Sequence, residues 1–174
     1  MASSVRPLQK DDDRTSFRSG DADLDHFFHR YAGQNQFRHR AGVTYVYEHE
    51  ARIVAYMTVT AWTMESDVLA VVEGRKFPPY PLPALKIARL ATAEGERGRG
   101  YGSALVAYAC AMAFKMSREM GCVGISTDAK RDAVDYYAAR GFVFFDTVED
   151  HGAPPDAEKE MFLSLRKIET ALGE

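Results

Sequence analysis

Residues 85–106 read LKIARLATAEGERGRGYGSALV, and this stretch predicts a strand, a glycine-rich turn and a helix in direct succession. Residues 85–92 are mostly apolar, as expected for a strand. Residues 103–120 are apolar nearly all round and contain no glycine or proline, which predicts a buried helix. The turn between them holds three glycines and two arginines, in the order Arg97-Gly98-Arg99-Gly100-Tyr101-Gly102.

This turn predicts a binding site for an anion. Glycines let the backbone approach a ligand closely, and the first amides of a helix have no acceptor within the helix. The helix dipole and the side chains of Arg97 and Arg99 add positive charge suited to phosphate, so a pyrophosphate is the expected ligand. The turn is not a Walker A loop, because no Gly-Lys-Ser/Thr follows. It is not a dinucleotide-binding fingerprint either, because residue 103 is serine.

Outward from this stretch, the chain alternates helix-like and strand-like segments. An apolar stripe predicts a helix that begins after Asp21 and ends near Gln36. Alternating and β-branched segments predict the other strands, and Gly141 ends a second short helix. The expected strands are residues 43–48 and 52–61 as a hairpin, 123–127, 142–145 and 161–165; the short helix is 133–140, and 77–83 is an extended loop. This order predicts an α/β (α+β) fold with one mixed sheet, in a single domain over residues 1–174.

Composition narrows the class of protein. The 174 residues are 46% hydrophobic and 27% charged, which fits a chain with a buried core. No apolar run is long enough for a membrane helix, and residues 1–14 lack the apolar segment of a signal peptide, so we expect a cytoplasmic protein that makes no membrane contact. Cys110 and Cys122 are too few for a disulfide framework, and His26 and His29 lack a third ligand, so we expect no metal.

The charges are unevenly distributed although the formal net charge is only −3. Residues 30–40 and 75–89 each carry several cations and no carboxylate, whereas acidic residues gather at 11–13 and 146–160. Folding could join the two basic stretches into one cationic surface. The alternative is ordinary solvated loops and helix faces. The candidate substrate-binding residues are Arg38, Arg40 and Arg89.

Two motifs resemble the GCN5-related N-acetyltransferases, called GNAT. Arg97-x-x-Gly100-x-Gly102 is similar to the family's Q/R-x-x-G-x-G/A signature, which holds the pyrophosphate of acetyl-CoA. Residues 133–142 (AVDYYAARGF) are similar to its A-x-x-F-Y-x-x-x-G-F element. The residues Phe17-Arg18-Ser19-Gly20, the helix that follows and residues 44–46 resemble more narrowly the TacT-like toxin branch of the family.

The resemblance implies the GNAT fold and direct transfer of acetyl from acetyl-CoA to an amine. It implies that a strand bulge supplies a donor for the oxyanion, and that a tyrosine protonates the departing thiolate. Tyr137 matches that tyrosine, and its other interpretation is a core aromatic residue. The cofactor-binding residues would be Leu90, Ala91, Thr92, Arg97, Gly98, Arg99, Gly100, Tyr101, Gly102 and Ser103.

The toxin branch implies an aminoacyl-tRNA substrate, acetylated on its amino group, and a ribbon-helix-helix antitoxin as partner. Many members of the family dimerise, so a homodimer is also expected. Two alternatives stay open at this point. One is acetylation of a small-molecule or protein amine, which the net charge of −3 favours. The other is a GNAT-shaped binding module without catalytic activity.

Overall fold

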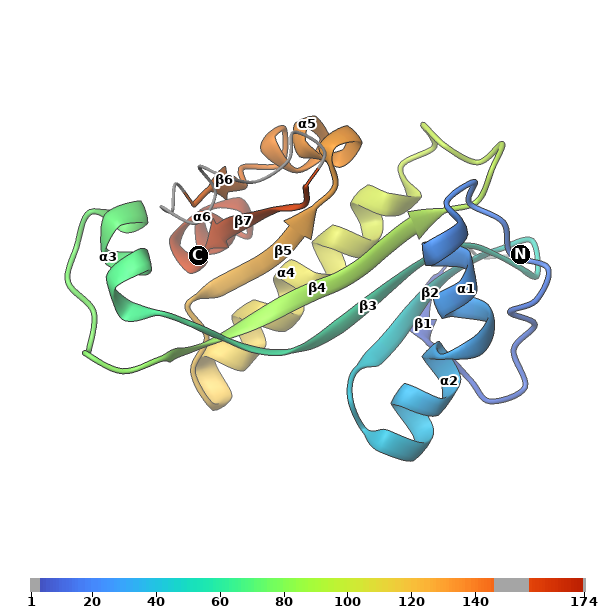
Figure 1. Cartoon of the computed structure of the whole chain (residues 1–174), viewed down its shortest axis with the longest axis horizontal. Helices are drawn as coiled ribbons and strands as arrows, with labels where there is room; N and C mark the ends of the chain where they lie inside the picture. Colours follow the sequence, from blue (N-terminus) through green and yellow to red (C-terminus); the bar gives the residue numbers. More distant parts are fainter. Residues whose placement is uncertain (1–3, 146–156, 174) are drawn as a thin grey trace. The chain divides into compact units, whose positions relative to one another are not determined.

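The chain folds around a mixed seven-stranded sheet, seen in a computed structural model that describes residues 4–145 and 157–173 (Figure 1). The strands hydrogen-bond in the order β1-β2-β3-β4-β5-β7-β6. In chain order the elements are β1 (Ser4–Pro7), α1 (Ala22–Arg30), α2 (Ala32–Gln34), the π-helical turn η1 (Asn35–His39), β2 (Val43–His49), β3 (Arg52–Met64), α3 (Ser66–Glu73), β4 (Leu82–Thr92), α4 (Tyr101–Glu119), β5 (Gly124–Ala129), the 3-10 turn η2 (Arg131–Ala133), α5 (Val134–Ala138), β6 (Val143–Phe144), β7 (Lys159–Ser164) and α6 (Leu165–Ala171).

Backbone contacts divide the chain into two compact units. Unit 1 comprises Met1–Thr60 and Ile87–Ala109, and unit 2 comprises Ala61–Lys86 and Cys110–Glu174. The chain passes from one unit to the other within β3, close to the middle of β4 and within α4.

Unit 1 contains the predicted hairpin. β2 and β3 pair antiparallel, with Val43 opposite Val59 and His49 opposite Arg52. The two turn residues, Glu50 and Ala51, have φ angles of 51° and 61°. Both therefore lie in the left-handed region that a two-residue hairpin turn requires, although neither is glycine. β1, which the sequence did not predict, pairs antiparallel with β2.

The core of unit 1 follows from the alternation of side chains along β2. Val46 is fully buried in a cluster with Phe17, Phe27, Phe28 and Tyr56. Tyr45 and Tyr47 point to the opposite face, where their rings lie 4.9 Å from Tyr108 and 4.7 Å from Tyr101 of α4. Within this unit α1 thus covers one face of the strands and the first part of α4 covers the other.

The first helix begins where the sequence predicts. The Asp21 side chain accepts hydrogen bonds from the amides of Asp23 and Leu24, which makes Asp21 the N-cap. The helical segment ends later than expected, because α2 continues into η1 as far as His39. It stops at Arg40, which has a left-handed φ of 55°.

Unit 2 is built on β5, which pairs antiparallel with β7, while β7 pairs antiparallel with β6. Its core comprises Met64, Leu69, Leu82, Ala84, Phe145 and Phe162. The predicted strand over residues 142–145 is confirmed only as the two residues of β6. The solvated loop expected over the acidic stretch 146–160 lies mostly outside the described residues, since residues 146–156 are not among them.

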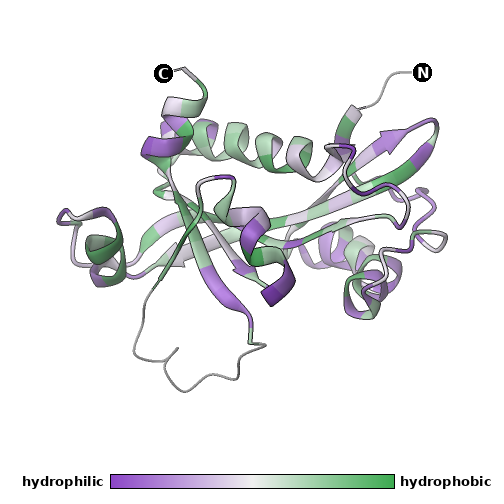
Figure 2. Cartoon of the chain, turned by 90° about the horizontal axis from the view of Figure 1, so that it is seen from above, coloured by the Kyte–Doolittle hydropathy of each residue, from purple (hydrophilic) through white to green (hydrophobic). Residues whose placement is uncertain are grey.

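Three further expectations differ from the structure. The helix predicted over 103–120 begins at Tyr101, and it is not buried all round, because Ala107, Tyr108 and Ala111 are exposed. Figure 2 shows that the residues along this helix are mostly apolar or neutral in hydropathy. Small alanines on an exposed face cost little, so apolar composition alone did not reveal that face. Neither α3 nor α6 was predicted. Among the described residues, no helix has both the length and the apolar character needed to cross a membrane.

Candidate active site

The glycine-rich turn lies between the end of β4 and the start of α4, as the sequence predicts. Gly98 and Gly100 have φ angles of 80° and 86°, and no heavy atom lies within 4 Å of the point where a Cβ would sit on either residue. The backbone of the turn is therefore open to an approaching ligand. Its positive φ angles are ones that other residue types rarely adopt.

The glycine-rich turn leads directly into the first turn of α4. The amide of Ala104 donates to the carbonyl of Gly100, at 3.0 Å, and closes the first helical turn. The amides of Tyr101 and Gly102 precede that bond and have no acceptor within the helix. The first turn of α4 contains no acidic residue, so nothing there opposes the positive end of the helix dipole. The Tyr101 ring packs against Tyr47 and His49 of β2.

The two arginines of the turn behave differently. Arg99 is exposed and forms an ion pair with Glu96, at 3.4 Å, while Glu96 also pairs with Arg52, at 3.0 Å. The Arg99 side chain is 58% exposed but the Glu96 side chain only 12%, and Glu96 keeps its ion pair with Arg52 if Arg99 turns toward a phosphate. The Arg97 guanidinium instead donates to the carbonyl of Ser19, at 2.5 Å. The sequence did not predict either partner.

The predicted pantetheine-binding residues lie on β4. Ala91 is buried in the core cluster of unit 1, while Leu90 and Thr92 are half-buried. The next amide, that of Ala93, donates to the carbonyl of Val54 on β3, at 2.8 Å. The role of residues 90–92 and the bulge expected there stay predictions.

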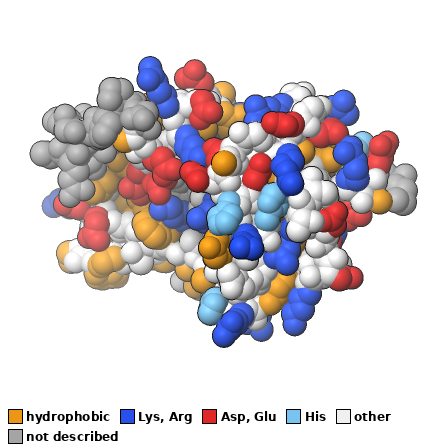
Figure 3. All heavy atoms as spheres, turned by 45° about the vertical axis from the view of Figure 1, so that its right-hand side comes forward, with side chains coloured by type: hydrophobic (Ala, Val, Ile, Leu, Met, Phe, Trp, Pro, Cys, Tyr) orange, Lys and Arg blue, Asp and Glu red, His pale blue; other side chains and the backbone are white. Residues whose placement is uncertain are grey.

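The three candidate substrate arginines all belong to unit 1. Arg38 and Arg40 are exposed at the end of η1, beside the exposed His39. Figure 3 shows Lys, Arg and His side chains gathered along the lower edge of the molecule, where Figure 1 places the end of the α2 segment. Arg89 is half-buried, with its guanidinium 3.8 Å from the ring centroid of Phe27. Arg89 therefore stabilises the packing of α1, and its role toward a substrate stays a prediction.

Tyr137 lies in unit 2, on α5, and is only 5% exposed. Its ring packs edge-on against Phe142, with 5.1 Å between centroids, and its hydroxyl is hydrogen-bonded to the side chain of Thr127. Burial raises the pKa of Tyr137 to about 12. The phenol therefore keeps its proton at neutral pH, as a general acid must. Thr127 is a partner that the sequence did not predict.

The structure brings the predicted cofactor-binding residues together in unit 1 and places Tyr137 in unit 2. It also shows contacts of the loop that the sequence analysis missed, through Ser19, Arg52 and Glu96. The Phe17-Arg18-Ser19-Gly20 block stands out in the sequence only by its resemblance to the toxin branch, which predicts no contact with the loop. Long-range ion pairs such as Arg52–Glu96 leave no local sequence pattern.

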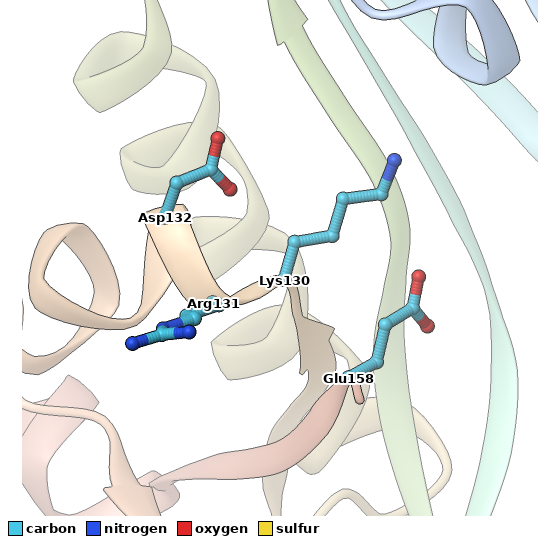
Figure 4. A pocket seen from close by; sticks show the side chains of 4 residues that line it. All are labelled: Lys130, Arg131, Asp132 and Glu158. Atoms are coloured by element: carbon cyan, nitrogen blue, oxygen red, sulfur yellow. The ribbon is translucent and has the colours of Figure 1, made fainter. Parts of the chain in front are cut away.

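A separate hollow of about 530 Å³ lies in unit 2 beside the start of η2. It is lined by Lys130, Arg131, Asp132 and Glu158, whose side chains are shown in Figure 4. The hollow therefore carries charges of both signs. In residues 4–145 and 157–173, no three His, Cys, Asp or Glu side chains gather as metal ligands would.

Comparisons with known proteins agree with this geometry. The model of the acetyltransferase (GNAT) family matches residues 4–142. A protein of Mycobacterium tuberculosis (strain ATCC 25618 / H37Rv), called tRNA-acetylating toxin, is 30% identical over 130 residues, which are 75% of this chain and 77% of the relative. The structure of AtaT complexed with acetyl-methionyl-tRNAfMet is 21% identical, with a TM-score of 0.83, and the match covers 98% of this chain and 99% of that one.

A second solved structure is a tyrosine-to-phenylalanine variant of the toxin AtaT, bound to the C-terminus of the antitoxin AtaR and to acetyl-CoA. It is 19% identical with a TM-score of 0.80, and the match covers the whole of both chains. The sheet, the loop and the family match together define an acetyltransferase that uses acetyl-CoA. The chain belongs to the GNAT family. The predictions of this family, of the mixed α/β fold and of acetyl-CoA as cosubstrate are thereby confirmed.

Proposed function

We propose that the chain transfers the acetyl group of acetyl-CoA to the α-amino group of aminoacyl-tRNA and acts as a toxin that blocks translation. The observation that carries this proposal is the 30% identity, over three quarters of the chain, with a relative called tRNA-acetylating toxin. The similar structures of AtaT with acetyl-methionyl-tRNAfMet and of its variant with acetyl-CoA support it.

The open turn before α4 would hold the pyrophosphate of acetyl-CoA. Gly98 and Gly100 provide access to the backbone, and the amides of Tyr101 and Gly102 provide donors. The exposed Arg99 would turn from Glu96 to the phosphate, leaving Glu96 paired with Arg52. Residues 90–92 would hold the pantetheine arm by backbone hydrogen bonds. The proposed cofactor-binding residues remain Leu90, Ala91, Thr92, Arg97, Gly98, Arg99, Gly100, Tyr101, Gly102 and Ser103.

The proposed reaction is a direct transfer. The amine nitrogen attacks the thioester carbonyl carbon, a backbone amide in residues 90–92 stabilises the oxyanion, and the C–S bond then breaks. Tyr137 donates its hydroxyl proton to the departing thiolate, and the proton that the amine nitrogen loses on forming the amide restores the phenol. Its pKa of about 12 keeps that proton available at neutral pH, and the hydrogen bond with Thr127 orients the hydroxyl.

We also propose specific contacts with the tRNA substrate and specific partners. Arg38 and Arg40 would contact the tRNA, because exposed cations without a local carboxylate suit phosphate. Arg89, which is half-buried against Phe27, is proposed as a third contact. A ribbon-helix-helix antitoxin, a homodimer, a cytoplasmic location and one GNAT domain over residues 1–174 complete the proposal. The AtaT–AtaR structure supports an antitoxin partner in general.

The deciding experiment measures transfer of labelled acetyl from acetyl-CoA to charged tRNA, compared with a panel of free amines. Label in the aminoacyl moiety of the charged tRNA, and none on uncharged tRNA, is the expected result. Fast transfer to a polyamine or an aminoglycoside, with none to charged tRNA, would establish the small-molecule alternative. Absence of transfer to every amine, despite acetyl-CoA binding, would establish a binding module.

A further inference from the structure

The segment Phe17–Gly20 just before α1 contacts the turn that precedes α4. Phe17 is buried in the core of unit 1 and fixes the start of this segment. The carbonyl of Arg18 accepts a hydrogen bond from the amide of Glu94, at 2.8 Å, and the carbonyl of Ser19 accepts one from the Arg97 guanidinium, at 2.5 Å. Two consecutive carbonyls of this segment therefore accept hydrogen bonds from residues that precede or begin the glycine-rich turn.

Ser19 is itself held in place by α1. Its amide and its hydroxyl both donate to Oδ1 of Asp25, at 2.9 and 2.6 Å. Ser19 is 2% exposed and Asp25 is 9% exposed, so these charge-assisted bonds are shielded from water. The orientation of Ser19, and with it the direction of its carbonyl, is thereby fixed from the first turn of α1.

Gly20 is required by the same arrangement. Its φ is 91°, and a Cβ on this residue would lie 2.8 Å from Glu94 Oε1 and 3.7 Å from Arg97 Nη2. The Glu94 side chain could swing away from such a Cβ. The φ angle could not relax without rotating the peptide group that carries the Ser19 carbonyl, since φ of Gly20 describes rotation next to that peptide.

We propose that Asp25, Ser19 and Arg97 form a clasp that positions the acetyl-CoA loop before the cofactor arrives. Among the proposed cofactor-binding residues, Arg97 then acts indirectly: it is a positioning residue whose guanidinium binds the protein backbone, while Arg99 and the backbone amides meet the pyrophosphate. A loop ordered in advance loses less conformational entropy on binding, so the clasp raises affinity. This inference rests on the proposed binding of acetyl-CoA at the loop, and it assigns a function to the Phe17-Arg18-Ser19-Gly20 block.

The first test breaks the Ser19–Arg97 contact by a substitution at Gly20, which is not one of the proposed cofactor-binding residues. Gly20→Val should weaken acetyl-CoA binding about tenfold or more by calorimetry, since a charge-assisted hydrogen bond is lost. It should raise KM for acetyl-CoA and leave kcat at saturation close to that of the wild type. Gly74→Val is the matched control, because Gly74 has a φ of 65° and nothing within 4 Å of its Cβ position. It imposes similar backbone strain away from the clasp and should leave affinity unchanged.

The second test is a double-mutant cycle for acetyl-CoA affinity. If Arg97 acts only through Ser19, then Gly20→Val and Arg97→Gln remove the same contact. The acetyl-CoA affinity of the double variant should then be no lower than that of the single variant with the lower affinity. Additive losses would mean that Arg97 binds the pyrophosphate itself, which overturns the proposal. Arg118→Gln, on the last turn of α4, controls for loss of a surface charge.

Hydrogen exchange measures whether acetyl-CoA binding is coupled to the clasp. A clasp with a purely structural role would show no such coupling. Acetyl-CoA should increase the protection of the Ser19 and Glu94 amides in the wild type, and less in Arg97→Gln, because the coupling between the two segments is reciprocal. If Gly20→Val fails to fold, Asp25→Asn replaces it in both tests. Folded variants with wild-type affinity would overturn the clasp alone. A wild type that does not bind acetyl-CoA would overturn the proposed function instead.

Discussion

Tyr137 is the side chain on which the proposed chemistry depends. Phenylalanine keeps the ring packing against Phe142 but removes the hydroxyl that contacts Thr127. If the hydroxyl protonates the thiolate, Tyr137→Phe should lower turnover by about 10²–10⁴-fold and leave acetyl-CoA affinity unchanged. Steady-state rates and calorimetry measure the two quantities. Thr127→Val, which leaves the phenol in place, should lower turnover far less. Near-normal turnover in Tyr137→Phe would return the residue to the core-aromatic interpretation.

The same burial makes Tyr137 a source of alkaline instability. Its pKa rises from 10.0 to about 12, so the folded chain keeps a proton that the unfolded chain has already lost in this range. Unfolding then releases a proton, and the free energy of unfolding falls as pH rises from 10 to 12.

Phenylalanine cannot titrate, so Tyr137→Phe should lose less stability over that range than the wild type. Two pKa units correspond to roughly 2–3 kcal/mol, so the difference in the free energy of unfolding between the wild type and Tyr137→Phe should shrink by that amount. Urea unfolding below pH 10 and near pH 12 measures the gap. Tyr56, whose pKa burial also raises, contributes equally to both proteins and cancels. A constant gap would contradict the prediction.

At the scale of elements, the turn between β4 and α4 is expected to be specific for phosphate. Gly100→Glu places a carboxylate where nothing lies within 4 Å of the Cβ position, so its side chain meets no clash and repels the pyrophosphate. The φ of 86° strains a residue with a Cβ by about 1–2 kcal/mol, which the fold should survive. Acetyl-CoA affinity should fall by at least about tenfold, since an unfavourable charge contact costs over 1 kcal/mol. Gly95→Glu is the control, with a similar φ of 79° and an equally open position. Unchanged affinity in a folded Gly100→Glu variant would remove the site.

The β2–β3 turn offers a prediction about stability alone. Ala51 has a φ of 61°, which costs about 1 kcal/mol for a residue with a Cβ. Ala51→Gly should therefore raise the free energy of unfolding by about 0.5–1 kcal/mol, measured in urea. The same change at Ala107, an exposed residue inside α4, should lower it by about 1 kcal/mol. Equal signs at the two positions would contradict the assignment of the turn.

The elements that sequence patterns could predict are those whose signals are local. Asp21 with the apolar stripe after it located α1, and the glycine-rich turn located the junction of β4 and α4. The signals failed where tertiary packing decides. α3 buries only Leu69 and α6 only Ile168, so neither has a wide apolar stripe. The Ser19–Arg97 contact joins residues far apart in the chain, and backbone carbonyls carry no sequence signal.

At the scale of the whole molecule, the question is how a chain of net charge −3 would bind a polyanion. The answer proposed is local: Arg38 and Arg40 stand exposed beside His39, within a stretch that lacks carboxylates. Binding through phosphate contacts is salt-dependent, because each neutralised phosphate releases counterions. The rate on charged tRNA should therefore fall steeply with salt in the wild type.

The double variant Arg38→Glu, Arg40→Glu should lose most of its activity on charged tRNA and show a shallower salt dependence, because two phosphate contacts are replaced by repulsion. Its acetyl-CoA affinity should not change, since both side chains lie outside the loop before α4. Lys115→Glu with Arg166→Glu is the matched control, because it reverses two exposed charges on α4 and α6 and shifts the net charge by the same amount. The measurement is the initial rate against salt concentration for charged tRNA and for a free amine. Equal and salt-insensitive rates on tRNA in the wild type and the double variant would make residues 30–40 ordinary solvated surface and move the proposed substrate to a small amine.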